Sequence, residues 1–382
     1  MQATLVNTGT LDTTGKRFRC GLLALAALVC SVGPARALER PAALRFDVDG
    51  TVSIAVESSL RLPSSVAVDL SELETRLFAD ASDGRLDQHT LMEAALVASG
   101  VATRAELDAL VRRFDERLAD WRRGGLDSLP TTRRVAMLFE LMHADLLGGG
   151  YRSDCSDLAE LLQAGRFNCV SATVIWQCLA EFFDLDSIAL ESPGHVHAQI
   201  IVDGRMIELE TTCPQWFEIL DDPAKQQAAR GRVGAGAPPS RRALTSVGLL
   251  AALYYNRGIE LLERRLYAEA VAANAKALRL DPDSTIAHGN LLAVLNNWAL
   301  DLGSQGDFER ATHLLAESRQ AAPDHETFAI NYVAVHQQWI DRLIAEQRLV
   351  EAHGLARRLE VELPQERFFR DIQVDIRNRR QR

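Results

Sequence analysis

Three residue types that together perform acyl transfer occur in the middle of the chain, in the order cysteine, histidine, carboxylate. They are Cys169, His195 and Glu210. A cysteine attacks a carbonyl carbon as its thiolate, a histidine takes and returns the proton, and a carboxylate orients and stabilises the imidazolium. The predicted chemistry is formation of a thioester, which water resolves in an amidase or peptidase and an amine resolves in a crosslinking enzyme.

The residues around Cys169 predict a helix that begins at the cysteine. Asn168 is a favourable N-cap, and apolar residues follow at helical spacing: Val170, Val174, Leu179, Phe182 and Phe183. Cys169 would then lie in the first turn, where unpaired N–H groups and the helix dipole favour a thiolate and could hold the oxyanion formed by its attack. The competing interpretation is a small cysteine buried in an apolar helix.

The residues after this helix predict strands that carry the histidine and the carboxylate. We expect strands at 186–190, 195–202 and 205–210, with turns at 192–194 and 203–204. His197 is two residues from His195 and therefore lies on the same face of its strand, and Glu208 is related to Glu210 in the same way. His197 is thus the alternative base and Glu208 the alternative acid.

Two other functions use the same residues. His195, His197 and Glu210 could hold zinc, because two histidines two apart on a strand point the same way, but the helix start at Cys169 would then be coincidental. Alternatively, the core is catalytically silent and the protein is a scaffold, since a fold does not fix an activity. Reaction of Cys169 with a thiol-directed electrophile across pH separates a scaffold from an activated nucleophile.

Three motifs resemble the transglutaminase-like superfamily, and more closely its bacterial SirB-related branch. They are Asn168-Cys-Val-Ser-Ala172, Pro193-Gly-His-Val196 and Glu208-Leu-Glu-Thr-Thr212, within about residues 70–220. The resemblance implies an α+β fold with a papain-like core, in which Cys169 is the nucleophile, His195 the base and Glu210 stands where the wider superfamily has an aspartate. It also implies tetratricopeptide-like repeats after this core. We expect no cofactor and no metal.

The first 37 residues predict a secretory signal. Basic residues at 16, 17 and 19 precede an uncharged stretch from Cys20 to Val32, and Ala35-Arg-Ala37 is a small-x-small cleavage site. An apolar run of 13 residues is too short to span a bilayer. We therefore expect an exported protein, periplasmic or secreted, that begins at Leu38 and has no stable membrane span.

The composition is that of a globular protein with two or three domains: 382 residues, 47% hydrophobic and 25% charged. The formal net charge is −10, and removal of the basic signal makes it more negative, so nucleic acid and anionic membranes are poor partners. Four cysteines would remain in the exported chain: Cys155, Cys169, Cys178 and Cys213. In an oxidising compartment two of them could pair, and no spacing indicates which.

The remaining sequence divides by pattern. We expect an N-terminal arm at 38–69, a transglutaminase-like domain at 70–221 and a linker at 222–249, where Ala, Gly and Pro residues follow no period. Within the domain, helices are predicted at 86–99, 104–122, 132–147 and 155–162. Asp80-Ala-Ser-Asp-Gly84 resembles a calcium loop but has alanines at ligand positions, so we expect a turn there.

Residues 250–366 repeat with a period of 41 residues. Equivalent positions in the three units are Ala270, Ala311 and Ala352; Pro282, Pro323 and Pro364; and Asn256, Asn297 and Gln338. The first unit matches the tetratricopeptide pattern, whose usual period is about 34 residues. Stacked helical units would offer a groove to a peptide or protein partner; alternatively, the array packs on the catalytic domain as a lid or forms a dimer interface. Residues 367–382 are expected to be a tail.

Overall fold

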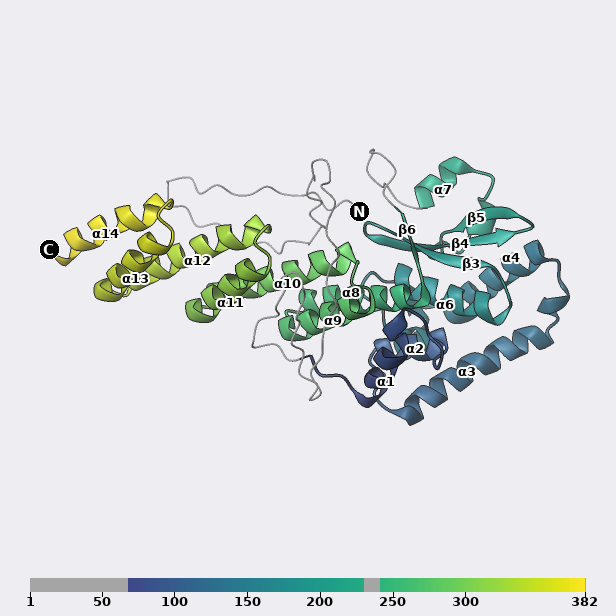
Figure 1. Cartoon of the computed structure of the whole chain (residues 1–382). Helices are drawn as coiled ribbons and strands as arrows, with labels where there is room; N and C mark the ends of the chain where they lie inside the picture. The colour runs from purple at the N-terminus through teal and green to yellow at the C-terminus, as the bar shows by residue number, and fades with distance from the viewer. Residues whose placement is uncertain (1–67, 230–240, 382) are drawn as a thin grey trace. The chain divides into compact units, whose positions relative to one another are not determined.

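The computed structural model describes residues 68–229 and 241–381. Helices predominate in these residues and two small sheets complete the fold, so the predicted mixture of helices with small sheets is confirmed (Figure 1). The predicted signal at 1–37 and all but the last two residues of the predicted arm lie outside the described residues.

Six α-helices of the described residues precede the larger sheet. They are α1 (Glu72–Asp80), α2 (Leu91–Ala98), α3 (Arg104–Arg123), α4 (Thr131–Leu141), which continues as a π-helix (Met142–Leu146), α5 (Leu158–Ala164) and α6 (Cys169–Phe182). The four predicted helices before α6 are confirmed. However, α2 and α5 begin later than expected, because the side chains of Thr90 and Asp157 accept hydrogen bonds from their first turns and fix their starts there.

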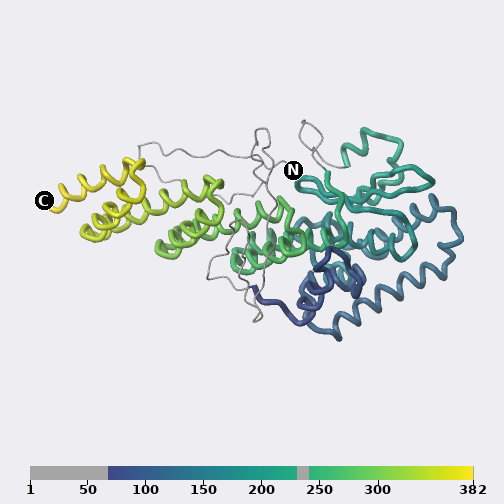
Figure 2. The backbone as a smooth tube through the Cα atoms, viewed as in Figure 1, coloured from purple at the N-terminus to yellow at the C-terminus, as the bar shows by residue number. Residues whose placement is uncertain are grey.

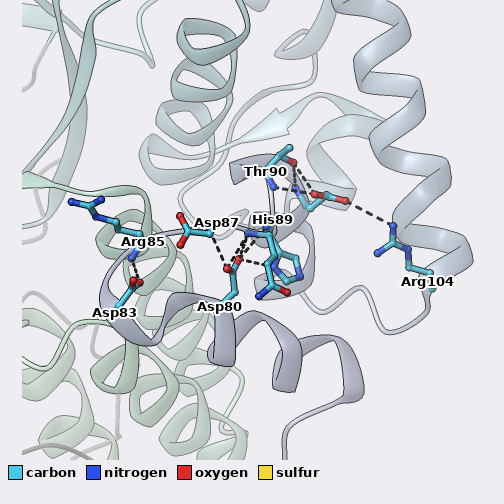
Figure 3. Close-up of polar contacts among 9 residues, drawn as sticks. Asp80, Asp83, Arg85, Asp87, His89, Thr90 and Arg104 are labelled. Atoms are coloured by element: carbon cyan, nitrogen blue, oxygen red, sulfur yellow. Dashed lines mark hydrogen bonds and ion pairs between the residues drawn. The ribbon is translucent and has the colours of Figure 1, made fainter.

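The connection between α1 and α2 folds around the carboxylate of Asp80 (Figure 3). Its oxygens accept hydrogen bonds from the backbone N–H groups of Asp87, Gln88 and His89 at 3.0–3.1 Å, and one oxygen lies 2.8 Å from Nδ1 of His89. Burial would raise the pKa of Asp80, but these hydrogen bonds outweigh burial and lower it. The carboxylate therefore holds the turn that leads into α2.

The larger sheet is antiparallel, with strand order β5-β4-β3-β6. β3 (Ser187–Ser192), β4 (His195–Val202) and β5 (Arg205–Leu209) are the three predicted strands. Ser192 lies opposite His195 across the β3–β4 turn. α6 packs against β4, and the fully buried Ala198 and Ile200 of β4 belong to their common core.

The segment expected to be a linker is partly built into the fold. It contains α7 (Pro223–Ala229) and β6 (Arg242–Leu244), which pairs with β3, and α8 (Ser246–Glu263) begins in it; residues 230–240 lie outside the described part. The expectation of a linker as far as residue 249 is therefore corrected. A three-residue strand is too short to show a periodic pattern, so only the neighbouring strand identifies it.

Residues 246–380 form helices that pack in sequence, each against the next (Figure 2). After α8 these are α9 (Tyr267–Leu280), α10 (Thr285–Ser304), α11 (Phe308–Ala321), α12 (Glu326–Ala345), α13 (Leu349–Glu362) and α14 (Arg367–Arg380). The equivalent alanines of the repeat are all fully buried. The segment expected to be a tail is instead α14, which packs on α13 because Phe369 and Ile376 recur at helical spacing and are buried.

Helix α8 connects the repeats to the rest of the fold. Every residue from Val247 to Tyr255 is buried, in one core with α2, α6 and the sheet. Most of the buried side chains of α10–α14 form a second core. The first repeat helix is therefore also a core helix of the α+β part.

Candidate active site

Cys169 is the first residue of α6, as the sequence predicts. Oδ1 of Asn168 accepts hydrogen bonds from the N–H groups of Val170 and Ser171, both at 3.0 Å. The Ser171 hydroxyl oxygen accepts one from the Asn168 N–H at 2.9 Å, which completes a capping box. Two of the first-turn N–H groups are thus already paired with the cap. They are not available to an oxyanion, in contrast to the expectation that the whole first turn could serve it.

His195 and Glu210 form a close pair. Nε2 of His195 lies 2.7 Å from Oε2 of Glu210, whose side chain is only 2% exposed. The other carboxylate oxygen of Glu210 accepts a hydrogen bond from the Thr212 hydroxyl at 2.7 Å. A glutamate therefore reaches the imidazole despite its additional methylene, and its second oxygen is held.

The imidazole of His195 also interacts with Cys169. Burial alone would lower the pKa of His195, but its interactions with Cys169 and Glu210 outweigh burial and raise this pKa to about 10. Burial would likewise raise the pKa of Glu210, and the contact with His195 lowers it instead. At neutral pH the site therefore holds an imidazolium between a sulfur and a carboxylate.

His197 and Glu208, the alternative base and acid, have different surroundings. The ring of His197 stacks on that of His195, with centroids 5.7 Å apart and planes 10° from parallel. Burial, aided by the charge of His195, lowers the pKa of His197 to about 4, so this histidine is neutral at physiological pH. Glu208 is ion-paired with Arg241. The contacts to Cys169 and Glu210 belong to His195.

A glycine-rich segment that sequence reasoning treated only as a break positions a tyrosine beside this site. β1 (Gly150–Tyr151) pairs in parallel with β2 (Arg166–Phe167), directly before the nucleophile helix. A Cβ on Gly149 would lie 2.1 Å from the carbonyl oxygen of Ala164, so only glycine permits this approach. Burial and the charges of Cys169 and Glu210 raise the pKa of Tyr151. The run of three glycines was the available signal.

Two further contacts hold Thr211, the residue after Glu210, one from the nucleophile helix and one from the π-helix. The hydroxyl groups of Thr173, on α6, and Thr211 lie 2.9 Å apart and are buried. The His143 imidazole, in the π-helix, makes a hydrogen bond to the Thr211 backbone, yet burial dominates and lowers its pKa to about 4. No sequence pattern identified these contacts, because they join residues far apart in the chain.

A polar network joins the turn that presents His195 to the first two repeat helices. Glu191, near the end of β3 and 6% exposed, accepts a hydrogen bond from the Tyr255 hydroxyl of α8 at 2.7 Å. Arg242 of β6 contacts Glu191 at 2.8 Å and Asp281, at the end of α9, at 2.6 Å. The repeats thus hold the strand that leads to the His195 turn.

None of the four described cysteines forms a disulfide. Burial raises the pKa of the Cys155 thiol to about 12, and it also raises the pKa values of Cys178 and Cys213. These three thiols are therefore poor nucleophiles at neutral pH. The spacing of the cysteines in the sequence left open whether two of them form a disulfide. The structure shows all four as free thiols.

The comparisons with known proteins add no relative. No family model, curated protein or solved structure matches the chain. Among residues 68–229 and 241–381, no helix is long and apolar enough to cross a membrane. In the same residues, no group of three histidine, cysteine, aspartate or glutamate side chains is placed to hold a metal ion.

Proposed function

We propose that the protein is a transglutaminase-like cysteine enzyme that transfers an acyl group, or hydrolyses an amide, through a thioester on Cys169. The observation that carries the proposal is the position of His195, whose imidazole lies 2.7 Å from the buried Glu210 and has its pKa raised by Cys169 and Glu210 together. This arrangement supplies a nucleophile, a base and an orienting acid in contact with one another.

The first step follows from these contacts. His195 takes the thiol proton of Cys169, and the thiolate sulfur attacks the carbonyl carbon of the acyl donor. Glu210 stabilises the imidazolium and holds its Nε2, which leaves Nδ1 for the sulfur. Because Asn168 occupies the N–H groups of Val170 and Ser171, the N–H of Cys169 itself is the first-turn donor for the oxyanion.

The second half of the reaction returns the proton. The imidazolium gives its proton to the leaving amine as the C–N bond breaks and the thioester forms. Water or a second amine then attacks the thioester carbon, His195 removes the proton of this nucleophile, and Cys169 leaves as a thiolate. Tyr151, exposed beside the site, can contact the acyl donor.

The repeat array has a separate role in this proposal. Its helices bind a peptide or protein partner, and α8 fixes the array to the catalytic core through the contacts of Tyr255. The whole enzyme acts outside the cytoplasm after loss of residues 1–37, on the evidence of the basic, apolar and small-residue segments of the sequence.

The experiment is alkylation by iodoacetamide between pH 5 and pH 9, with the modified cysteine identified by peptide mass spectrometry. We expect Cys169 to react well below neutral pH, while Cys155, Cys178 and Cys213 stay unmodified because burial raises their pKa values. His195→Ala should remove the reaction at low pH. If Cys169 reacts only near the free-thiol pKa of about 8.5, the catalytic proposal fails and a silent scaffold takes its place.

A further inference from the structure

Two successive junctions of the repeat array have the same architecture and different chemistry. In each, a turn between paired helices and the aromatic residue that starts the second helix lie against a tryptophan of the next repeat. The stacked pairs are Tyr267–Trp298 and Phe308–Trp339, with centroids 6.2 and 6.0 Å apart and planes 5° and 10° from parallel. Each residue of the second pair follows its counterpart by 41 positions, so one junction is a reference for the other.

The first junction is closed by an ion pair. Arg265, in the turn before α9, reaches Asp301 near the end of α10, with Nη1 and Oδ1 2.7 Å apart. The side chain of Asp301 is only 14% exposed. Burial and the charge of Asp301 raise the pKa of the Tyr267 hydroxyl, and the charge of Arg265 opposes this rise. An ion pair between arginine and aspartate therefore lies at this junction, beside the aromatic pair.

The second junction lacks this ion pair and is open. Gly306 stands where the first junction has Arg265, and Arg342 stands where it has Asp301. A Cβ on Gly306 would meet no atom within 4 Å. A pocket of about 370 Å³ occupies the space, lined by the 303–306 turn, Phe308 and Trp339, and by Arg342, Glu346 and Arg348. The volume is at the lower end of the range for ligand sites, about 300–1,000 Å³.

The lining defines the chemistry of a ligand. Phe308 and Trp339 supply an apolar, planar wall. Nε of Arg342 contacts Glu346 at 2.5 Å, and Nη1 of Arg348 contacts the same carboxylate at 3.2 Å. Arg348 is also held by Glu351, whose carboxylate oxygens lie 2.8 Å from Nε and 2.7 Å from Nη2. Arg342 is 67% exposed and is therefore the guanidinium whose further donors match a ligand carboxylate.

We propose that this pocket binds an acidic segment of a partner peptide, with an apolar side chain against Phe308 and Trp339 and the adjoining carboxylate on Arg342. The inference rests on the proposed partner-binding role of the repeats and is independent of the chemistry at Cys169. The peptide should bind only at the second junction, because the ion pair of Arg265 and Asp301 stands at the equivalent position of the first.

The repeat itself provides the variant that closes the pocket. Gly306 has φ +87°, and the equivalent Arg265 and Gln347 have φ 59° and 61°, so this turn accepts a side chain in the left-handed conformation. Gly306→Arg combined with Arg342→Asp therefore recreates the residues of the first junction, with the arginine in the left-handed region that Arg265 already adopts. Arg342→Gln alone keeps the cavity and removes a charge. The melting temperature of each variant verifies that the array is folded.

The probe is N-acetyl-Phe-Asp-amide, added to the full chain labelled with ¹⁵N, and the readout is the indole N–H resonance of Trp339. Loss of one of the five indole signals in Trp339→Phe assigns it. We expect millimolar peptide to shift the Trp339 signal and leave that of Trp298 unchanged. N-acetyl-Phe-Asn-amide should bind at least tenfold more weakly, and the closed double variant should show no shift.

Three results would overturn the inference: no shift of Trp339, a shift that persists in the closed double variant, or equal binding of the aspartate and asparagine peptides. Alkylation of Cys169 should be the same in all these variants, because none of the substituted residues contacts the catalytic core. Failure at the pocket and failure at Cys169 are therefore observed separately.

Discussion

Replacement of Glu210 by glutamine tests the charge at the centre of the proposed mechanism. The glutamine side chain has the same length and can still contact Nε2 of His195, but it carries no negative charge. A hydrogen bond to a charged partner contributes about 1.5–3 kcal/mol. The imidazole of His195 is 31% exposed, so solvent screening favours the lower half of this range. We expect the imidazolium of His195 to lose about 1.5–2 kcal/mol of stabilisation.

This loss has two measurable consequences. The pKa of His195, about 10 in the native protein, should fall by roughly one unit or slightly more, since one unit corresponds to about 1.4 kcal/mol. The upper end of the pH range in which the imidazolium–thiolate pair exists should fall with this pKa, from about pH 10 to about pH 9, whereas at pH 6 the imidazolium is present in both proteins. NMR titration of histidine-labelled protein measures the first quantity and iodoacetamide kinetics the second.

Glu208→Gln is the matched control, because it makes the same substitution two residues away, at a carboxylate that is ion-paired with Arg241. We expect the pKa of His195 in this variant to stay at its native value. If Glu210→Gln also leaves this pKa unmoved, the carboxylate does not stabilise the imidazolium and the assignment of Glu210 is refuted.

Three other predictions concern His197, Asp80 and the N-terminus of the exported protein. His197→Ala should leave most low-pH reactivity of Cys169, because His197 is neutral; a larger loss than in His195→Ala would exchange their roles. Asp80→Asn should cost about 2–3 kcal/mol in urea unfolding at pH 7. Since the folded pKa of Asp80 is lowered, this difference should vanish as pH falls through it; a constant difference contradicts the account. Exported protein should begin at Leu38 by mass spectrometry; a product retaining residues 16–32 contradicts export.

Local signals in the sequence were sufficient for the elements that carry the site. Asn168 followed by helical apolar spacing fixed the start of α6 at Cys169, because an N-cap acts within its own turn. Alternation and the Asp203-Gly204 turn placed the strands, and β4 begins at His195 as predicted. The 41-residue period likewise predicted successive helix pairs, since equivalent alanines must lie where helices approach closely.

The tertiary structure decided which of the candidate residues meet. His195 and His197 share one face of a strand, so spacing could not separate them and only the resemblance favoured His195. Their different contacts arise from how the sheet packs on α6. Tyr255 donates a hydrogen bond to Glu191, 64 residues away, and β6 pairs with β3. No sequence pattern predicts either contact, because each joins segments that are far apart in the chain.

At the open junction around Gly306, too, the sequence supplied the residues and the tertiary structure supplied their proximity. The sequence contains the glycine and the arginine that replace Arg265 and Asp301, but their proximity is a property of the stacked helices. Patterns of spacing report which face of an element is buried, because burial repeats with the geometry of that element. They do not report which side chains from distant elements share a site, because those distances are set by the packing of the whole core.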